Sequence, residues 1–177
     1  MSSLRMVIAA GLAGTLLLAV PSSAQARQIL VEDPAGDTID PGLDMTSATF
    51  RNRDRAVVVT IAFTRDRRGE VIVAVDGRTR PSVRIVSQHR RQGPDRTFLI
   101  TRINDEAPCR GLSSDWDRAE AVVQLRMPAR CLGNGNYGAL RFWVLTEGAP
   151  GSSSSDVDYA PETSRGGLAF TDWVPRG

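Results

Sequence analysis

The hydrophobic positions of this chain follow the two-residue period of β-strands along most of its length. Short runs of apolar and β-branched residues alternate with polar ones, and Gly, Pro, Asn and Asp separate the runs. The pattern predicts strands at residues 28–31, 45–50, 56–63, 70–75, 82–88, 97–102, 120–127 and 137–146. No amphipathic helix follows residue 26, so we expect an all-β fold, an antiparallel β-sandwich or jelly roll of about eight strands.

The last predicted strand shows two alternating faces. Leu140, Phe142 and Val144 lie on one face, and Arg141 and Trp143 lie on the other. Trp143 belongs to a strongly apolar run and is expected in the core, where most aromatic residues of a sandwich pack. The closing segment 168–174 is expected to be ordered and to pack Phe170 and Trp173.

The first 26 residues form a separate unit with the three regions of a cleavable secretory signal peptide. Arg5 supplies the positive charge, residues 7–20 are apolar or small, and Ala24-Gln25-Ala26 is an A-x-A cleavage site. A membrane span needs about 20 apolar residues, and this core is shorter. We therefore expect a mature protein of one domain, residues 27–177, secreted to the extracellular space or cell envelope without stable membrane insertion.

Two cysteines, Cys109 and Cys131, lie in the part expected to be exported. A pair of cysteines in an oxidising compartment predicts a disulfide. Closing the loop between them would stabilise the fold by about 3 kcal/mol on the chain-entropy model. A metal site or a catalytic thiol would need His or further Cys residues nearby, and the sequence has none there.

All 22 basic residues are arginines, and the formal net charge is only +2. This near-neutral balance argues against general binding of polyanions such as nucleic acid. Arginines are nevertheless concentrated in residues 78–102, where Asp95 is the only acidic residue. The segment is either a face for acidic glycans, teichoic acids or anionic lipid head groups, or an ordinary solvated hairpin. The sequence leaves both interpretations open.

An acidic loop near the start of the domain is the most suggestive local feature. Calcium takes six to eight oxygen ligands from carboxylates and loop carbonyls, and a structural Ca²⁺ is the one candidate cofactor. The candidate ligands are Asp33, Asp37, Asp40 and Asp44, with Asp156 and Asp158 as further donors. The spacing is not that of an EF-hand. The alternative is that these aspartates accept backbone N–H bonds in turns.

Few residues point to catalysis. The only histidine, His89, lies beside two arginines and is expected at the surface. The chain lacks the G-x-S-x-G, H-E-x-x-H and S-x-x-K motifs, so we do not expect an enzyme. A carboxylate-pair hydrolase leaves no linear motif and stays an alternative. Trp116 and Tyr159 are the candidate residues for stacking on sugar rings.

Several short motifs carry a resemblance to known proteins. They are D-P-x-G-D at residues 33–37, M-P-A-R-C-L-G at 127–133 with the preceding Cys109, and the closing D-Y-A-P and D-W-V-P-R-G. With them the mature chain resembles small secreted β-sandwich proteins of GC-rich actinobacteria. Its opening is also similar to family 9 carbohydrate-binding-like modules, which often hold calcium and bind sugars. The binding aromatics of those modules do not match this chain residue by residue.

The sequence thus predicts a secreted, non-catalytic binding or interaction module at the cell envelope or outside it. The first alternative is a carbohydrate-binding module that uses Trp116 and Tyr159, with a cell-wall or extracellular glycan as its partner. The second alternative is a cell-envelope hydrolase.

Overall fold

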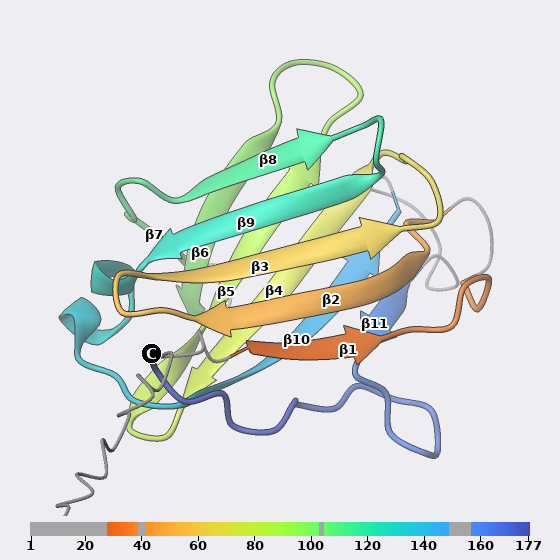
Figure 1. Cartoon of the computed structure of the whole chain (residues 1–177). Helices are drawn as coiled ribbons and strands as arrows, with labels where there is room; N and C mark the ends of the chain where they lie inside the picture. Colours follow the sequence, from red (N-terminus) through yellow and green to blue (C-terminus); the bar gives the residue numbers. More distant parts are fainter. Residues whose placement is uncertain (1–27, 39–41, 103–104, 149–156) are drawn as a thin grey trace, which may run out of the picture.

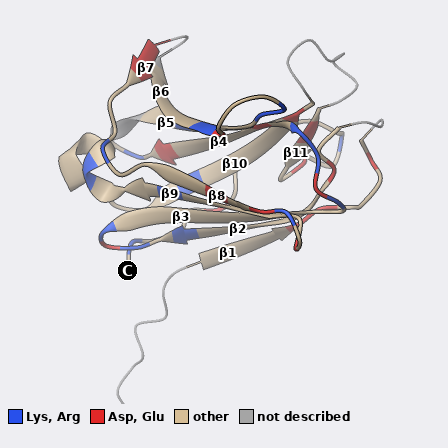
Figure 2. Ribbon diagram, turned by 90° about the horizontal axis from the view of Figure 1, so that it is seen from above, with Lys and Arg blue, Asp and Glu red and all other residues tan. Residues whose placement is uncertain are grey.

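The computed structural model describes residues 28–38, 42–102, 105–148 and 157–177, which form two antiparallel sheets packed face to face (Figure 1). Viewed from above, the two sheets are separate layers (Figure 2). The all-β sandwich expected from the sequence is confirmed. The predicted signal peptide and its cleavage site, together with Asp40 and Asp156, lie outside the described residues.

The described residues form eleven strands rather than about eight. In spatial order, the five-stranded sheet consists of β1 (Gln28–Glu32), β2 (Met45–Asn52), β3 (Ala56–Phe63), β9 (Val122–Pro128) and β8 (Ser113–Asp117). The six-stranded sheet consists of β11 (Asp158–Ala160), β10 (Leu140–Glu147), β4 (Gly69–Gly77), β5 (Arg80–His89), β6 (Arg96–Arg102) and β7 (Asp105–Ala107). The 3₁₀ turns η1 (Ala129–Cys131) and η2 (Gly133–Gly135) follow β9. The additional strands β7, β8 and β11 are too short for a clear period.

The core lies between the sheets and is made by alternate residues of their strands. Phe50 of β2 and Phe142 of β10 are fully buried and stack across it, with ring centroids 5.0 Å apart. Burial of such side chains supplies most of the stabilising free energy, at about 25 cal/mol per Å² of apolar surface. Trp143 is not part of this core, which corrects the prediction. It points to the outer face, because Phe142 and Val144 occupy the inward positions of β10.

Buried polar side chains attach the C-terminal segment to the sandwich. Asn52 is fully buried, and its Nδ2 donates hydrogen bonds to the carbonyls of Gly138 (3.1 Å) and Val174 (2.9 Å). Leu140 and Val174 exchange backbone hydrogen bonds of 3.0 and 2.7 Å. The segment therefore continues along the edge of β10 beyond β11, where it brings Phe170 and Trp173 to the outer face of the six-stranded sheet.

The disulfide between Cys109 and Cys131 is confirmed, with Cα atoms 5.5 Å apart. It joins the connection between β7 and β8 to η1, and so links a segment next to one sheet to the end of a strand of the other. Among the residues that the structure describes, no helix has the length and apolar character that crossing a bilayer requires.

Candidate functional site

The outer faces of the two sheets differ in chemistry. On the five-stranded sheet, cross-strand pairing produces an outward row that is mostly polar: Leu30, Thr49, Thr60, Gln124 and Asp115. On the six-stranded sheet, the equivalent outward row is apolar on all five strands that it crosses: Tyr159, Leu145, Ile72, Val86 and Phe98. An antiparallel sheet with one face in water normally keeps that face polar. Four residues of this apolar row are partly exposed, whereas Val86 is only 1% exposed. Apolar residues gathered on an outer face are typical of an interaction surface.

Beside this row, arginine side chains and aromatic rings lie over one another. The guanidinium of Arg141 is 4.3 Å from the ring centroid of Phe170 and 5.1 Å from that of Trp173. Trp143 meets Phe170 edge to face, with centroids 6.4 Å apart. Two further arginines lie over the two tryptophans, at 4.8 and 5.7 Å. We call this set the arginine–aromatic cluster: Arg78, Arg84, Arg141, Trp143, Phe170 and Trp173.

The stacking holds long, flexible side chains in fixed positions. A guanidinium over an aromatic face gains about 0.5–1 kcal/mol at exposed sites, and its N–H groups lie at the rim, where they can still donate hydrogen bonds. One of the three arginines is paired, since Arg141 Nε donates to Asp76 Oδ2 at 2.7 Å. The cluster therefore presents ordered guanidinium groups next to an apolar stripe. This arrangement suits a ligand with acidic groups on a partly apolar body.

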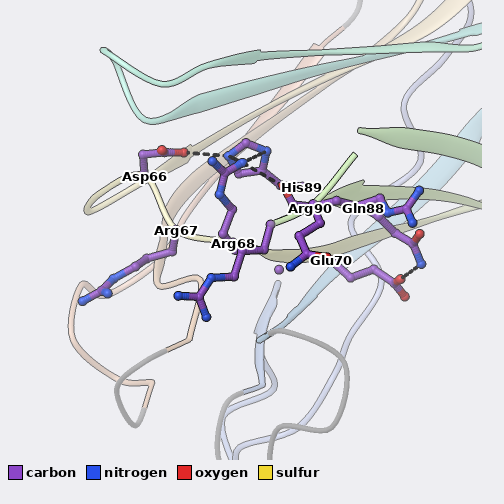
Figure 3. Close-up of a pocket in the computed structure, with 10 residues that line it drawn as sticks. Asp66, Arg67, Arg68, Glu70, Gln88, His89 and Arg90 are labelled. Carbon is purple, nitrogen blue, oxygen red and sulfur yellow. Dashed lines mark hydrogen bonds and ion pairs between the residues drawn. The ribbon is translucent and has the colours of Figure 1, made fainter. Parts of the chain in front are cut away.

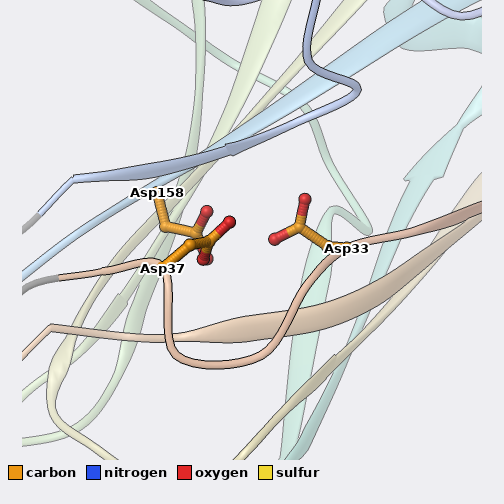
Figure 4. A group of neighbouring side chains, drawn as sticks. All are labelled: Asp33, Asp37 and Asp158. Carbon is orange, nitrogen blue, oxygen red and sulfur yellow. The ribbon is translucent and has the colours of Figure 1, made fainter. Parts of the chain in front are cut away.

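A second group of side chains lies where the loop after β1 meets β11, at the edges of the two sheets, and there three carboxylates converge. Asp33 and Asp37 come from the loop after β1, and Asp158 opens β11. Each residue offers an oxygen, and these oxygens all lie within 4.8 Å of one another (Figure 4). Calcium–oxygen distances are about 2.3–2.6 Å, so one ion could reach all three.

The buried environment of these carboxylates changes their ionisation. Burial, together with the charges of Asp158 and Asp37, raises the pKa of Asp33 to about 8. Burial also raises the pKa of Asp158 to about 6, although the backbone N–H of Met45 donates to its Oδ2 at 2.7 Å and opposes the shift. Asp33 Oδ2 is buried without a hydrogen-bond donor among the described residues. A cation or a proton shared with Asp158 would satisfy this oxygen.

The structure separates the aspartates that the sequence grouped together. Asp33 and Asp37 lie in the carboxylate group, which Asp158 completes. Asp44 has a different environment, because its carboxylate accepts hydrogen bonds from the backbone N–H of Gly36 at 2.9 and 3.1 Å. Asp44 therefore has the turn-stabilising role that was the alternative to metal binding. Asp40 is outside the described residues.

The two predicted stacking residues do not form one site. Trp116 lies on β8 and points inward, where its ring stacks on Phe63 (5.8 Å) and on His89 (4.6 Å). Its Nε1 donates to Ser87 Oγ at 3.1 Å. Tyr159 lies on β11, in the other sheet, and belongs to the apolar outer row. Because both neighbours of Trp116 cover its ring, Trp116 is poorly placed for a sugar.

His89 is only 2% exposed, so the expectation of a surface histidine is wrong. Its ring nitrogens face two carboxylates, with Nε2 3.2 Å from Asp66 Oδ1 and Nδ1 3.1 Å from Asp95 Oδ1. These two carboxylates come from different loops and are partly exposed, and Trp116 stacks on the ring. The neighbouring arginines, on which the expectation rested, do not hold the ring at the surface.

No known protein family, no curated protein and no solved structure matches the chain. Sequence reasoning did not find the arginine–aromatic cluster, although one signal for it is visible. Residues 71–75 of β4 are apolar without alternation (VIVAV), which indicates a strand with apolar neighbours on both faces.

Proposed function

We propose that the mature protein is a secreted, non-catalytic binding module that binds an acidic glycan on the outer face of its six-stranded sheet. The observation that carries this proposal is the contrast between the two outer faces. One carries a mostly polar row in which Leu30 is the apolar exception, and the other combines the apolar row from Tyr159 to Phe98 with the arginine–aromatic cluster. The first face is typical of a surface in water, and the second is typical of a surface with a partner.

The contacts within the cluster favour an acidic ligand over a neutral one. Arginine side chains lie over rings of Trp143, Phe170 and Trp173, so a neutral sugar has less free aromatic surface on which to stack. The same arginines carry planar N–H forks that match carboxylate and sulfate groups. Sugar C–H groups can lie on the apolar row while acidic substituents meet Arg78, Arg84 and Arg141.

A binding role fits the side chains better than catalysis does. Both ring nitrogens of His89 face a carboxylate oxygen, so neither is positioned to exchange a proton with a substrate. The alternative carbohydrate-binding site at Trp116 and Tyr159 has little support, because these residues belong to different sheets.

We also propose that a structural calcium ion binds at Asp33, Asp37 and Asp158. Three carboxylates lie together, and a single shared proton would leave most of their charge unbalanced. Hard oxygen donors are the ligands that calcium prefers. The ion would connect the loop after β1 to β11, at the edges of both sheets, and so stabilise the sandwich that carries the binding face.

Binding to defined polysaccharides tests the proposed ligand. Residues 27–177 are titrated with a uronic acid polymer and with its neutral, carboxyl-reduced form, at low and high salt. We expect binding to the acidic polymer, weakened by salt, and at least about tenfold weaker binding to the neutral one. Equal affinity for the two polymers, or binding to neither, would contradict the proposal. Polymer that becomes shorter during the incubation would show hydrolase activity instead.

Two variants assign the binding to one face. Arg84→Gln should weaken binding of the acidic polymer about tenfold, since it removes a charged donor held over Trp143. The matched control is Arg126→Gln, which changes an exposed arginine on the outer face of the five-stranded sheet. The control variant should bind like the unaltered protein. Equal losses in both variants would indicate only a general charge effect.

A further inference from the structure

Residues 66–70 and 88–92 line a cavity of about 810 Å³, and none of them belongs to the arginine–aromatic cluster (Figure 3). The pairing of β4 with β5 creates it, because the register sets Gly69 opposite His89. The two residues before Gly69 and the two after His89 are therefore neighbours. These residues are the consecutive pairs Arg67-Arg68 and Arg90-Arg91, so one hairpin brings four arginines to a single cavity.

The carboxylates at this cavity have other partners. Four arginines and two acidic residues, Asp66 and Glu70, line it. Asp66 contacts His89 Nε2 at 3.2 Å, and Glu70 Oε2 accepts a hydrogen bond of 2.6 Å from Gln88 Nε2. Arg90 and Arg91 are exposed, and neither is ion-paired to a carboxylate among the described residues. The lining residues therefore have a net charge of +2. Asp95 is not one of them, although its carboxylate contacts His89.

The floor of the cavity is rigid. Arg68 Nη1 lies 3.2 and 3.0 Å from the two ring nitrogens of His89. Arg68 Nη1 therefore lies over the face of the imidazole. An atom in the plane of the ring at these two distances would overlap other ring atoms. Trp116 stacks on this ring as well, at 4.6 Å, and Arg68 Nη1 also donates to the carbonyl of Arg90 at 3.0 Å. Arg68 is thus held in place before any ligand arrives.

We propose that this cavity binds a tetrahedral oxyanion, the phosphate or sulfate group of a small polar molecule. Arginine forks pair well with such groups, and converging arginines from two loops are a common way to hold them. The cavity volume is that of a small-molecule site rather than of a bare ion. The site is independent of the acidic glycan proposed for the sheet face, which lies elsewhere on the six-stranded sheet.

Calorimetric titration with inorganic phosphate, inorganic sulfate and a hexose phosphate tests the site, with sodium chloride at equal ionic strength as the blank. We expect the hexose phosphate to bind more tightly than either inorganic anion. Arg90→Gln and Arg91→Gln should each weaken its binding about tenfold, as loss of one charged hydrogen-bond donor does. Both positions are exposed, so their melting temperatures should match that of the unaltered protein.

Cross-tests separate this proposal from the glycan face. Arg84→Gln should leave hexose phosphate binding unchanged, and Arg91→Gln should leave binding of the uronic acid polymer unchanged. Arg126→Gln is the control for both. The proposal is overturned if none of the three anions binds at millimolar concentration, or if hexose phosphate binds equally well to Arg90→Gln, Arg91→Gln and the unaltered chain. Loss of polymer binding alone would overturn only the proposal for the sheet face.

Discussion

Phe142 and Trp143 are neighbours in β10 but lie on opposite faces of the same sheet. Phe142 is fully buried and stacks on Phe50 at 5.0 Å, whereas Trp143 is partly exposed and packs against Phe170 and beneath Arg84. Two large aromatic residues at consecutive positions therefore have different structural environments. The first belongs to the core, and the second belongs to the proposed binding face.

Alanine substitutions at these two positions should separate stability from binding. Phe142→Ala should lower the free energy of unfolding by about 3–5 kcal/mol, because it opens a cavity in the core. Trp143→Ala should cost only about 1 kcal/mol, since the side chain lies on the outer face and is partly exposed, yet it should weaken binding of the acidic polymer. Urea unfolding and polymer titration measure the two quantities. Similar stability losses in both variants would contradict the assignment of faces.

The carboxylate group predicts an unusual dependence of stability on pH. The pKa of Asp33 is about 8 in the folded protein, and its ordinary value is 3.8. The protonated side chain thus favours the folded state, an effect fully present below pH 3.8 and lost as the pH rises through about 8. Without calcium, the free energy of unfolding should fall across this range. Calcium should remove much of the fall and stabilise more at pH 8 than at pH 6.

Two variants test whether the ion binds at these residues. With a dissociation constant of about 0.1–1 mM, 10 mM calcium should add about 1–3 kcal/mol to the stability of the protein at pH 8. Asp37→Asn should lose most of this gain. Asp44→Asn should keep it, because Asp44 binds the Gly36 backbone rather than the carboxylate group. If calcium and a chelator give the same melting curves, the proton shared by Asp33 and Asp158 is the better account.

Asp95 should stabilise the fold at neutral pH and lose this effect in acid. Burial opposes ionisation of Asp95, but the backbone N–H of Arg90 and the ring of His89 outweigh it and lower the pKa of this carboxyl group. The stabilisation is therefore present above pH 3.8 and disappears as the pH falls through the lower folded-state pKa. Asp95→Asn should be destabilised by about 1 kcal/mol at pH 7, and the exposed Asp115→Asn should not. A difference that does not shrink as the pH is lowered below 3.8 would contradict this explanation.

Gly69 should not tolerate a side chain, although its backbone is ordinary strand. A Cβ atom at this position would collide with the backbone carbonyl of Glu147 and lie 2.6 Å from Leu43 Cδ1. Gly69→Ala should therefore lower the free energy of unfolding by about 1–3 kcal/mol. Gly138→Ala is the matched control, since its Cβ would meet nothing within 4 Å. Equal stability of the two variants, measured by urea unfolding, would show that the strand can shift at Gly69.

The alternation of side chains along the strands could be predicted from the sequence, but the face of each strand that packs against the other sheet could not. Alternation in residues 137–146 separates Phe142 from Trp143 correctly, because successive side chains point to opposite faces. Alternation does not say which face meets the other sheet when both faces carry large apolar residues. The disulfide was predictable because the two cysteines have no other partner. Strands β7, β8 and β11 were too short to leave a pattern.

The candidate sites depend on contacts between distant parts of the chain. Asp158 reaches Asp33 and Met45 only because β11 lies at the edge of the sheet next to the start of β2. His89 is buried because separate loops supply Asp66 and Asp95. The four arginines of the cavity could have been found from the sequence. The β4–β5 pairing shifts register between Val75 and Gly77, so counting outward from its turn sets Arg67-Arg68 beside Arg90-Arg91 only to within one residue.

Hydroxyl-radical footprinting with mass spectrometry tests the central claim, that the acidic glycan binds the outer face of the six-stranded sheet. A protein of residues 27–177 is oxidised with and without a saturating uronic acid polymer. Oxidation of Trp143, Phe170 and Trp173 should fall in the complex, whereas oxidation of the exposed Leu30 on the opposite sheet should not change. Protection of Leu30, or unchanged oxidation of all three cluster rings in the bound protein, would contradict the account.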